Sequence, residues 1–411
     1  MGVNVFPAAS GGASYSSQPP ASASSVLLDG QLVTVGSIST SVTGTGAPWL
    51  LYANGASTTT ITIAGTPYTV TAGSTVGTPA YTGSQSVSVA VGGGGFAGTP
   101  STFTASTMPS AIGYTGVTYG NGKFVAVSTY GVTAAGAYSA NGSTWSASTF
   151  PSANSWQGVA YGLVGATPTY VAVANGTTTA AYSTNGTTWT ASTMPSSFNW
   201  TSVTYGNGYF VAVAANTSSF TTAAYSADGI SWTASTMPNA VNWRGVAYGN
   251  GYFVATPGAS TNGAYSTNGT TWTTNTMPSS SNWRGVTYGN GYFVAVQSSG
   301  IAAGAYSANG STWSASTFPS ASSWYGVTYG NGYFVAVASG TTAGAYSTNG
   351  TTWTAGTMPS SSTWQSVTYG NGYFVAVQDT PTTAGAYFAF TAVPYNTPVA
   401  YGIYNGATVR A

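Results

Sequence analysis

The sequence predicts an all-β fold made of short repeated units that close into a ring. Three observations support this prediction. The composition is rich in Gly, Ser, Thr, Ala, Val, Tyr and Trp, which favours strands and turns over helices. Pairs of aromatic residues eleven positions apart recur seven times, with a period of 40 to 44 residues. Asn-Gly steps, which suit tight hairpin turns, recur at a similar spacing.

The aromatic pairs set the register of the repeat. A period in this range, combined with strand-like content, is typical of β-propeller blades, each of which is a sheet of four strands. In chain order the pairs are Phe103/Tyr114, Trp145/Trp156, Trp189/Trp200, Trp232/Trp243, Trp272/Trp283, Trp313/Trp324 and Trp353/Trp364.

Each unit divides into four strand-like segments, as the unit that begins at Trp283 illustrates. Its segments are residues 283–288, 292–296, 304–307 and 311–317, and Gly/Asn turns or a variable loop separate them. Segments this short and this rich in strand-forming residues predict an antiparallel meander. An isolated sheet of this kind would expose its aromatic side chains, so each unit is expected to stack on its neighbours.

The number of segments predicts how the ring closes. Each segment type occurs seven times, but the first copy of the fourth segment, residues 101–110, precedes the first copy of the first segment. The last unit ends after its third segment, near Tyr387, and has no fourth segment of its own. We therefore expect a seven-bladed β-propeller over residues 101–390, in which residues 101–107 complete the last blade.

The turn before the fourth segment resembles a known motif. The pattern S-x-N/D-G-x-x-W, as in residues 183–189 and 226–232, is similar to the Asp-box hairpin of sialidase-type propellers in six of the seven hairpins. It departs from that motif because the box usually has a residue between Asp and Gly, and because only Asp228 is acidic here. The resemblance implies a propeller fold rather than a particular activity.

The repeated aromatic residues have two interpretations. They are either wedges that pack between blades or platforms on which sugars stack, and their presence in every unit favours packing. The apolar residue of the Met-Pro or Phe-Pro step is interpreted in the same way in five units, as a buried plug where the chain crosses between blades. These residues are Met194, Met237, Met277, Phe318 and Met358.

The composition argues against several classes of function. The chain has 411 residues, only seven of them charged, with a net charge of +1 and no His, Cys or Glu. It lacks the basic patch that drives nucleic-acid binding, and no apolar run approaches the ~20 residues of a membrane-spanning helix. Without clustered carboxylates, His or Cys we expect no catalytic residues, no metal site and no cofactor.

Sequence variation among the repeats points to one end of the ring as a binding face. The loops after the second segments differ in sequence and length, whereas the turns at the other end are nearly uniform. The residue after the first-segment aromatic varies too, and these positions are expected to surround the mouth of the central channel: Thr115, Gln157, Thr201, Arg244, Arg284, Tyr325 and Gln365. The candidate ligand-binding residues are Arg244, Arg284, Tyr325, Gln157 and Gln365, with the loop aromatics Tyr130 and Phe220. The alternative is neutral drift at exposed loops.

The chain is expected to contain four parts. Residues 1–25 form a flexible segment rich in Ser, Ala, Gly and Pro, and residues 26–100 form a small β domain with a glycine hinge at 92–95. Residues 101–390 form the propeller. Residues 391–411 form a tail that either adds a strand to the small domain or contacts a partner. The ends of the propeller segment are expected to lie on the uniform face. This suggests an anchor on the uniform face and a recognition surface on the opposite face, where the loops vary.

This combination of features resembles bacteriophage virion appendages such as tail fibres, spikes and head fibres. The resemblance implies a protein made in the host cytoplasm, in keeping with the absence of a visible signal peptide, and displayed on the virion surface. The leading hypothesis is a non-enzymatic structural protein that docks on other virion proteins through its N-terminal region and binds a host-surface glycan or receptor. It is compatible with a homo-oligomer, and the sequence does not specify the oligomeric state. The alternatives are a purely structural capsid or tail decoration and a bacterial surface lectin or adhesin.

Overall fold

The computed structural model divides the chain into two units. One comprises Met1–Ala97 with Ala392–Ala411, and the other, called the ring unit below, comprises Gly98–Thr391. The structure describes residues 96–129, 135–215 and 222–392, strands between residues 25 and 90, and residues 400–405; side chains are described within 98–390. All regular structure in these described residues is strand, so the all-β prediction is confirmed.

The N-terminal unit contains one seven-stranded sheet. The strand order is β2-β1-β34-β3-β6-β4-β5. β34 lies between β1 and β3 and runs parallel to β1 and antiparallel to β3, so the tail adds a strand to this sheet. Contact between the tail and a partner stays a prediction. The expected flexible segment and glycine hinge lie outside the described residues. The strands are β1 (Ser25–Leu28), β2 (Gln31–Thr34), β3 (Ile38–Asn54), β4 (Thr59–Ile63), β5 (Thr66–Val70), β6 (Thr75–Ala90) and β34 (Ala400–Asn405).

The two connections between the units form a short sheet of their own, in which β7 (Phe96–Ala97) pairs with β33 (Thr391–Ala392). Within the ring unit the chain begins and ends at one place. The Phe388 and Phe390 rings lie next to Gly98, and the N–H of Phe390 donates to the carbonyl oxygen of Gly372. Because Gly372 belongs to a turn at the uniform end of the ring, both ends of this unit lie at that end.

The ring unit follows the four-segment repeat. Its inner strands are β9 (Tyr114–Gly120), β13 (Trp156–Val164), the second half of β16 (Thr190–Gly206), β20 (Asn242–Gly249), β24 (Trp283–Gly289), β28 (Ser323–Gly330) and the second half of β30 (Thr354–Gly370). The second strands are β10 (Lys123–Ser128), β14 (Thr167–Ala174), β17 (Tyr209–Ala215), β21 (Tyr252–Gly258), β25 (Tyr292–Gln297), the first half of β29 (Tyr333–Ser347) and β31 (Tyr373–Gln378).

The outer half of each unit completes the meander. The third strands are β11 (Ala135–Ser139), β15 (Thr177–Ser183), β18 (Thr222–Ser226), β22 (Ser260–Ser266), β26 (Ala303–Ser307), the second half of β29 and β32 (Ala384–Ala389). The fourth strands are β12 (Ser146–Thr149), the first half of β16, β19 (Thr233–Thr236), β23 (Thr273–Ser281), β27 (Ser314–Thr317), the first half of β30, and β8 (Thr104–Thr107).

The strands group differently from the seven separate sheets that the repeat predicts. Apart from the β7–β33 pair, the described part of the ring unit contains three four-stranded sheets, one seven-stranded sheet and one six-stranded sheet. The two larger sheets arise because the crossover between units stays extended in β16 and β30. Residues 190–193 of β16 pair with β15, for example, whereas residues 199–206 pair with β17.

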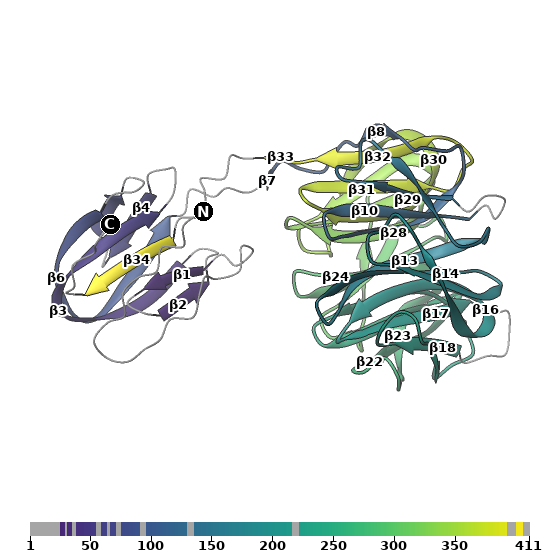
Figure 1. The fold of residues 1–411 in the computed structure, drawn as a ribbon, viewed down its shortest axis with the longest axis horizontal. Helices are drawn as coiled ribbons and strands as arrows, with labels where there is room; N and C mark the ends of the chain where they lie inside the picture. Colours follow the sequence, from purple (N-terminus) through teal and green to yellow (C-terminus); the bar gives the residue numbers. More distant parts are fainter. Residues whose placement is uncertain are drawn as a thin grey trace. The chain divides into compact units, whose positions relative to one another are not determined.

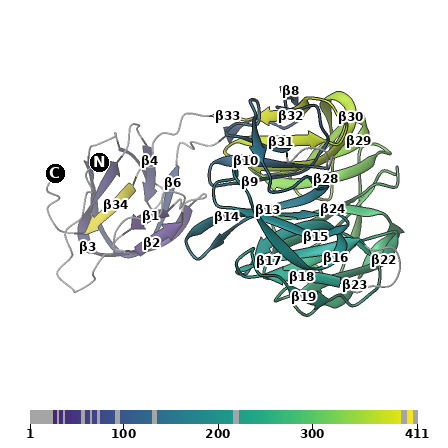
Figure 2. The ribbon, with the colours of Figure 1, turned by 45° about the vertical axis from the view of Figure 1, so that its right-hand side comes forward.

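The ring closes through the N-terminal strand. β8 pairs antiparallel with β32, with Ala386 opposite Ala105, so the pairing predicted from the segment count is confirmed. In both views the blue strand β8 lies beside the yellow strand β32 (Figure 1 and Figure 2). The core is continuous across this seam, because Val375 and Val377 pack with Tyr114 and Phe124.

The repeated aromatic residues are packing residues. The inner-strand aromatics are fully buried, from Tyr114 to Trp364. Fourth-strand aromatics stack on the preceding unit, as Trp353 does on Phe318 with ring centroids 4.3 Å apart. The apolar residues of the Met-Pro and Phe-Pro steps are buried as well. The wedge and plug interpretations are therefore confirmed, and the inner-strand rings have no exposed face on which a sugar could stack.

The S-x-N/D-G-x-x-W turns hold their shape with side-chain oxygens. In one of them Ser226 Oγ accepts from the N–H of Gly229 at 2.8 Å, and Asp228 Oδ1 accepts from two further N–H groups. Asn268 Oδ1 accepts from the matching two N–H groups in the next repeat, both at 3.0 Å. The turn thus requires an acceptor oxygen rather than a charge, which explains how a nearly uncharged chain builds it repeatedly.

A tyrosine ring lying on a glycine joins each inner strand to the next. A Cβ built on Gly249 would lie 2.0 Å from Cγ of Tyr288, so only glycine leaves room for the ring. The same contact recurs around the whole ring and crosses the seam. The pairs are Gly120/Tyr161, Gly162/Tyr205, Gly206/Tyr248, Gly249/Tyr288, Gly289/Tyr329, Gly330/Tyr369 and Gly370/Tyr119.

Replacing one of these glycines should destabilise the ring. We expect Gly249→Ala to lower the free energy of unfolding by about 1–3 kcal/mol, because the methyl group displaces the Tyr288 ring from a close-packed interface. Denaturant unfolding followed by tryptophan fluorescence measures the change.

A matched control is Gly344→Ala, also in a strand, where the nearest atoms to a built Cβ lie at 3.5 Å, an ordinary contact. This variant should change the free energy of unfolding by less than about 0.5 kcal/mol. Equal unfolding midpoints for the two variants would contradict the structural role of the tyrosine–glycine contact.

Candidate functional site

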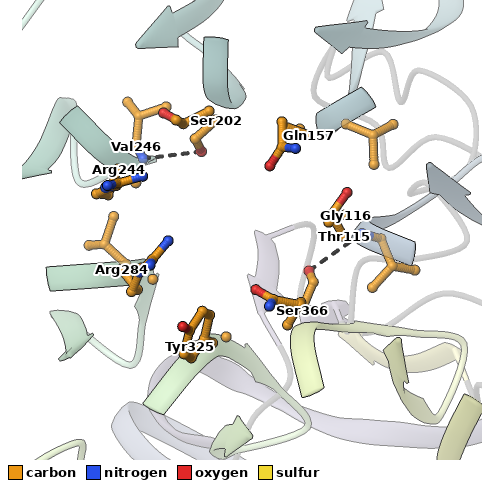
Figure 3. Close-up of a pocket in the computed structure, with 18 of the residues that line it drawn as sticks. Thr115, Gly116, Gln157, Ser202, Arg244, Val246, Arg284, Tyr325 and Ser366 are labelled. Carbon is orange, nitrogen blue, oxygen red and sulfur yellow. Dashed lines mark hydrogen bonds between the residues drawn. The ribbon is translucent and has the colours of Figure 1, made fainter. Parts of the chain in front are cut away.

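A pocket opens at one mouth of the central channel of the ring unit. It has a volume of about 180 Å³, far more than the ~10–15 Å³ that one water molecule needs. Each inner strand contributes three consecutive residues near its start, and Figure 3 shows side chains from these strands arranged around the opening. The first of the three residues is the variable one: Thr115, Gln157, Thr201, Arg244, Arg284, Tyr325 or Gln365.

The second lining position holds the inner strands close together. It is glycine in five strands, and a Cβ on Gly245 would lie 2.5 Å from the carbonyl oxygen of Arg284. Serine takes this position in the other two strands and forms a hydrogen bond across the gap. Ser202 Oγ accepts from the N–H of Val246 at 3.3 Å, and Ser366 Oγ accepts from the N–H of Val117 at 3.4 Å (Figure 3). The pocket floor is therefore a tight ring of backbone.

The threonines at the first position serve the scaffold. Thr115 Oγ1 donates to the carbonyl oxygen of Trp156 at 2.8 Å, and Thr201 Oγ1 donates to that of Trp243 at the same distance. These hydroxyls link neighbouring inner strands, which leaves the two arginines, Tyr325 and the two glutamines as the first-position side chains that do not bridge inner strands by a hydrogen bond.

Arg284 is held in place from two sides. Its guanidinium carbon lies 4.7 Å from the centre of the Tyr325 ring, a cation–π contact. Its Nε–H donates to Ser298 Oγ at 3.2 Å. Ser298 lies in the loop after β25, and buried Gln297 organises that loop by accepting from the N–H of Ser299 and donating to the carbonyl oxygen of Ile301. The positive charge of Arg284 is thus held in one position by Tyr325 and by the loop that contains Ser298.

Arg244 lies on the neighbouring strand, β20, and its guanidinium has fewer hydrogen-bond partners than that of Arg284. Its Nε is buried and has no hydrogen-bond partner. Burial lowers the pKa of Arg244, and the positive charge of Arg284 lowers it further, while Tyr325 opposes the shift. A buried donor without a partner costs about 1–3 kcal/mol, and more when it is charged.

The pocket contains two positive charges and no negative one. The described residues include two carboxylates, and neither lines the pocket. Asp228 lies in a turn of the uniform end, and although burial would raise its pKa, N–H donation from Ser231 and Ile230 lowers it. Asp379 accepts from Thr129 Oγ1 at 2.6 Å, and burial raises its pKa against that hydrogen bond.

Of the candidate residues predicted from sequence, the structure brings five into this one pocket: Arg244, Arg284, Tyr325, Gln157 and Gln365. Tyr130 and Phe220 lie outside the described residues. Sequence reasoning missed Ser298 and Gln297, which support Arg284, and Ser202 and Ser366, which bridge inner strands. The signal available in advance for the two bridging residues was serine replacing glycine at a fixed place in the repeat.

Comparisons with known proteins identify the fold. Virginiamycin B lyase from Staphylococcus aureus aligns with 70% of this chain and 99% of its own, at 12% identity and a TM-score of 0.61. YCF48, solved bound to the D1 peptide, covers 73% and 99%, at 15% identity and 0.56. The WD40 β-propeller domain of Doa1 covers 70% and 95%, at 14% identity and 0.53. The chain has a β-propeller fold, and at these identities the likeness shows the fold alone.

Neither family models nor curated proteins provide a match. One of the structural neighbours is an enzyme, but at 12% identity this leaves the activity of the present chain open. Within the described residues no three His, Cys, Asp or Glu side chains gather to hold a metal ion. No helix in that part of the chain is long and apolar enough to cross a membrane.

The raised pKa of Asp379 predicts a pH-dependent effect of its replacement. Because the folded state holds this proton more tightly than the unfolded state, the carboxyl favours folding at low pH and loses that contribution as the pH rises. Asp379→Asn keeps an acceptor oxygen for Thr129 and removes the charge. We expect it to raise stability by up to about 1 kcal/mol near pH 7, after solvent screening, and to have little effect near pH 3.

Denaturant unfolding at both pH values measures this difference. Asp228→Asn is the control of opposite sign, because the pKa of Asp228 is lowered in the folded state and its charge is favourable at neutral pH. It should leave stability unchanged or slightly reduce it near pH 7. An equal gain in both variants would show that burial of the Asp379 charge is not the cause.

Proposed function

We propose that this chain is a non-enzymatic phage virion structural protein, of the tail-fibre or head-fibre type, whose propeller binds a host-surface glycan or receptor. The observation that carries the proposal is the pocket at the channel mouth. In a chain whose units are otherwise nearly identical, seven equivalent positions meet in one place and carry threonine, glutamine, arginine and tyrosine. Variation on a rigid repeated scaffold is the usual basis of a binding site.

The same proposal takes the ring to have seven blades. In its support, β16 and β30 each pair as the fourth strand of one unit and the inner strand of the next. β29 likewise pairs with β28 through its first half and with β30 through its second half. On this count the seven-stranded and six-stranded sheets hold two four-stranded blades each, and the turns related to the Asp box serve the structure of the blades.

A glycan ligand suits the chemistry of the pocket. The lining offers amide groups from Gln157 and Gln365, guanidinium groups from Arg244 and Arg284, and the ring of Tyr325. Such side chains form hydrogen bonds with sugar hydroxyls and apolar contacts with sugar ring faces. The absence of His and Glu from the chain supports a binding role rather than acid–base catalysis.

In this proposal the N-terminal unit is the anchor. Its sheet includes β34 from the C-terminal segment, so residues near both ends of the chain build one body that is separate from the ring unit. We place the protein on the virion surface, with that body bound to other virion proteins. A purely structural decoration would have the same anchor but no ligand at the channel mouth.

Binding to intact host cells tests the proposal. We expect the full chain to bind a susceptible strain saturably, and Arg244→Ala/Arg284→Ala/Tyr325→Ala to lose at least about tenfold in affinity, because several polar contacts are removed together. Flow cytometry with the labelled protein across a bacterial panel measures both.

Two controls accompany this experiment. Thermal melting establishes that the triple variant is folded, and deleting residues 1–100 should abolish association with purified particles. If a folded full chain bound particles but no strain in a broad panel, the structural decoration would replace the receptor-binding proposal.

A further inference from the structure

We infer that the ligand of this pocket is an acidic glycan whose anionic group, a carboxylate or a sulfate, binds between Arg244 and Arg284. The inference rests on the proposed glycan-binding function and specifies the chemical class of its ligand. It goes beyond that function because a neutral glycan would satisfy the proposal above equally well.

The first argument is the charge balance of the pocket. The two guanidinium groups lie on adjacent inner strands, β20 and β24, and both contribute to the lining (Figure 3). They are close enough for the charge of Arg284 to act on Arg244. Neither described carboxylate lines the pocket, so two like charges stand together without a counter-charge. Binding an anion would turn this repulsion into attraction.

The second argument is the placement of Arg244. Its Nε is buried and lies over Gly258, where a Cβ would approach Nε within 3.1 Å. Glycine at this position therefore admits the guanidinium, whose side chain lines the pocket. An anion placed between the arginines would accept charge-assisted hydrogen bonds from the terminal nitrogens of Arg244, the strongest type available to such a group.

The third argument is the preorganisation of Arg284. Tyr325 and Ser298 hold its guanidinium in one place, so little side-chain entropy would be lost on binding. Tyr325 and Ser298 act here as positioning residues. Because the other five first positions hold two Thr, two Gln and one Tyr, the anionic group would sit to one side of the channel axis, with the neutral part of the glycan reaching toward Gln157 and Gln365.

Matched sugar pairs test this inference on the full chain. Methyl glucuronide is compared with methyl glucoside, and galactose 6-sulfate with galactose, by isothermal titration calorimetry and saturation-transfer NMR. We expect at least one acidic member to bind about tenfold more tightly than its neutral partner, and added salt to weaken only the acidic sugar. Acetate and inorganic sulfate alone are measured alongside.

Arg244→Gln and Arg284→Gln should each remove most of the preference for the acidic sugar, lowering its affinity by about tenfold while leaving the neutral sugar unchanged. Lys123→Gln is the matched control. It removes the same charge at the other end of the ring, where Lys123 donates to the carbonyl oxygen of Asn185, and should have no effect on sugar binding. Melting curves establish that all three variants are folded.

The outcomes separate this inference from the proposed function. Equal binding of acidic and neutral sugars, unaffected by the arginine variants, would overturn the inference and leave glycan binding intact. Free acetate or sulfate binding as tightly as the acidic sugars would mean that the pocket selects a small anion, which also overturns it. Absence of any sugar binding, together with a negative cell assay, would overturn both.

Discussion

The contact on which the ring depends is the tyrosine ring that lies on the glycine of the preceding inner strand. It recurs at every inner-strand junction of the ring, including the seam where Tyr119 meets Gly370. Because each inner strand carries Tyr-Gly in sequence, every unit provides the ring for one neighbour and the flat surface for the other. Removing the side chain at one position thus allows a large aromatic contact at the next, and the strands approach closely enough to close a narrow channel.

The inner strands also approach each other closely at the end of the channel where the pocket lies. The floor of the pocket is a ring of glycine and serine, where the backbone of each inner strand nearly touches the next. The residue just before this floor projects its side chain around the mouth, and only where it is threonine does it form a hydrogen bond to the next inner strand. The same scaffold can therefore carry threonine, glutamine, arginine or tyrosine at that place, and repetition of the scaffold is compatible with an asymmetric pocket.

Because the chain has only seven charged residues, the two arginines of the pocket account for a large share of its positive charge. Turns that contain Asp in related motifs are built here with Asn oxygens in all but the Asp228 turn, and the fold needs no ion pairs among its described residues to hold the turns. The charge of the pocket lining is consequently that of Arg244 and Arg284, because no described carboxylate is among the lining residues. The pocket therefore differs from the uniform surface around it by two positive charges that have no structural role. One of them, on Arg284, is held in place by Tyr325 and Ser298.

The sequence by itself determined the all-β class, the four-segment unit, the burial of the repeated aromatics and the completion of the last unit by β8, because these follow from periodicity and from counting segments. It also indicated which residues surround the channel mouth, since equivalent positions of a repeat must meet in a ring. Only the tertiary structure decided that β16 and β30 run unbroken between units, that β34 lies between β1 and β3 in the N-terminal sheet, and that Ser298 holds Arg284. These features depend on contacts between segments distant in the chain, for which a local pattern carries no signal.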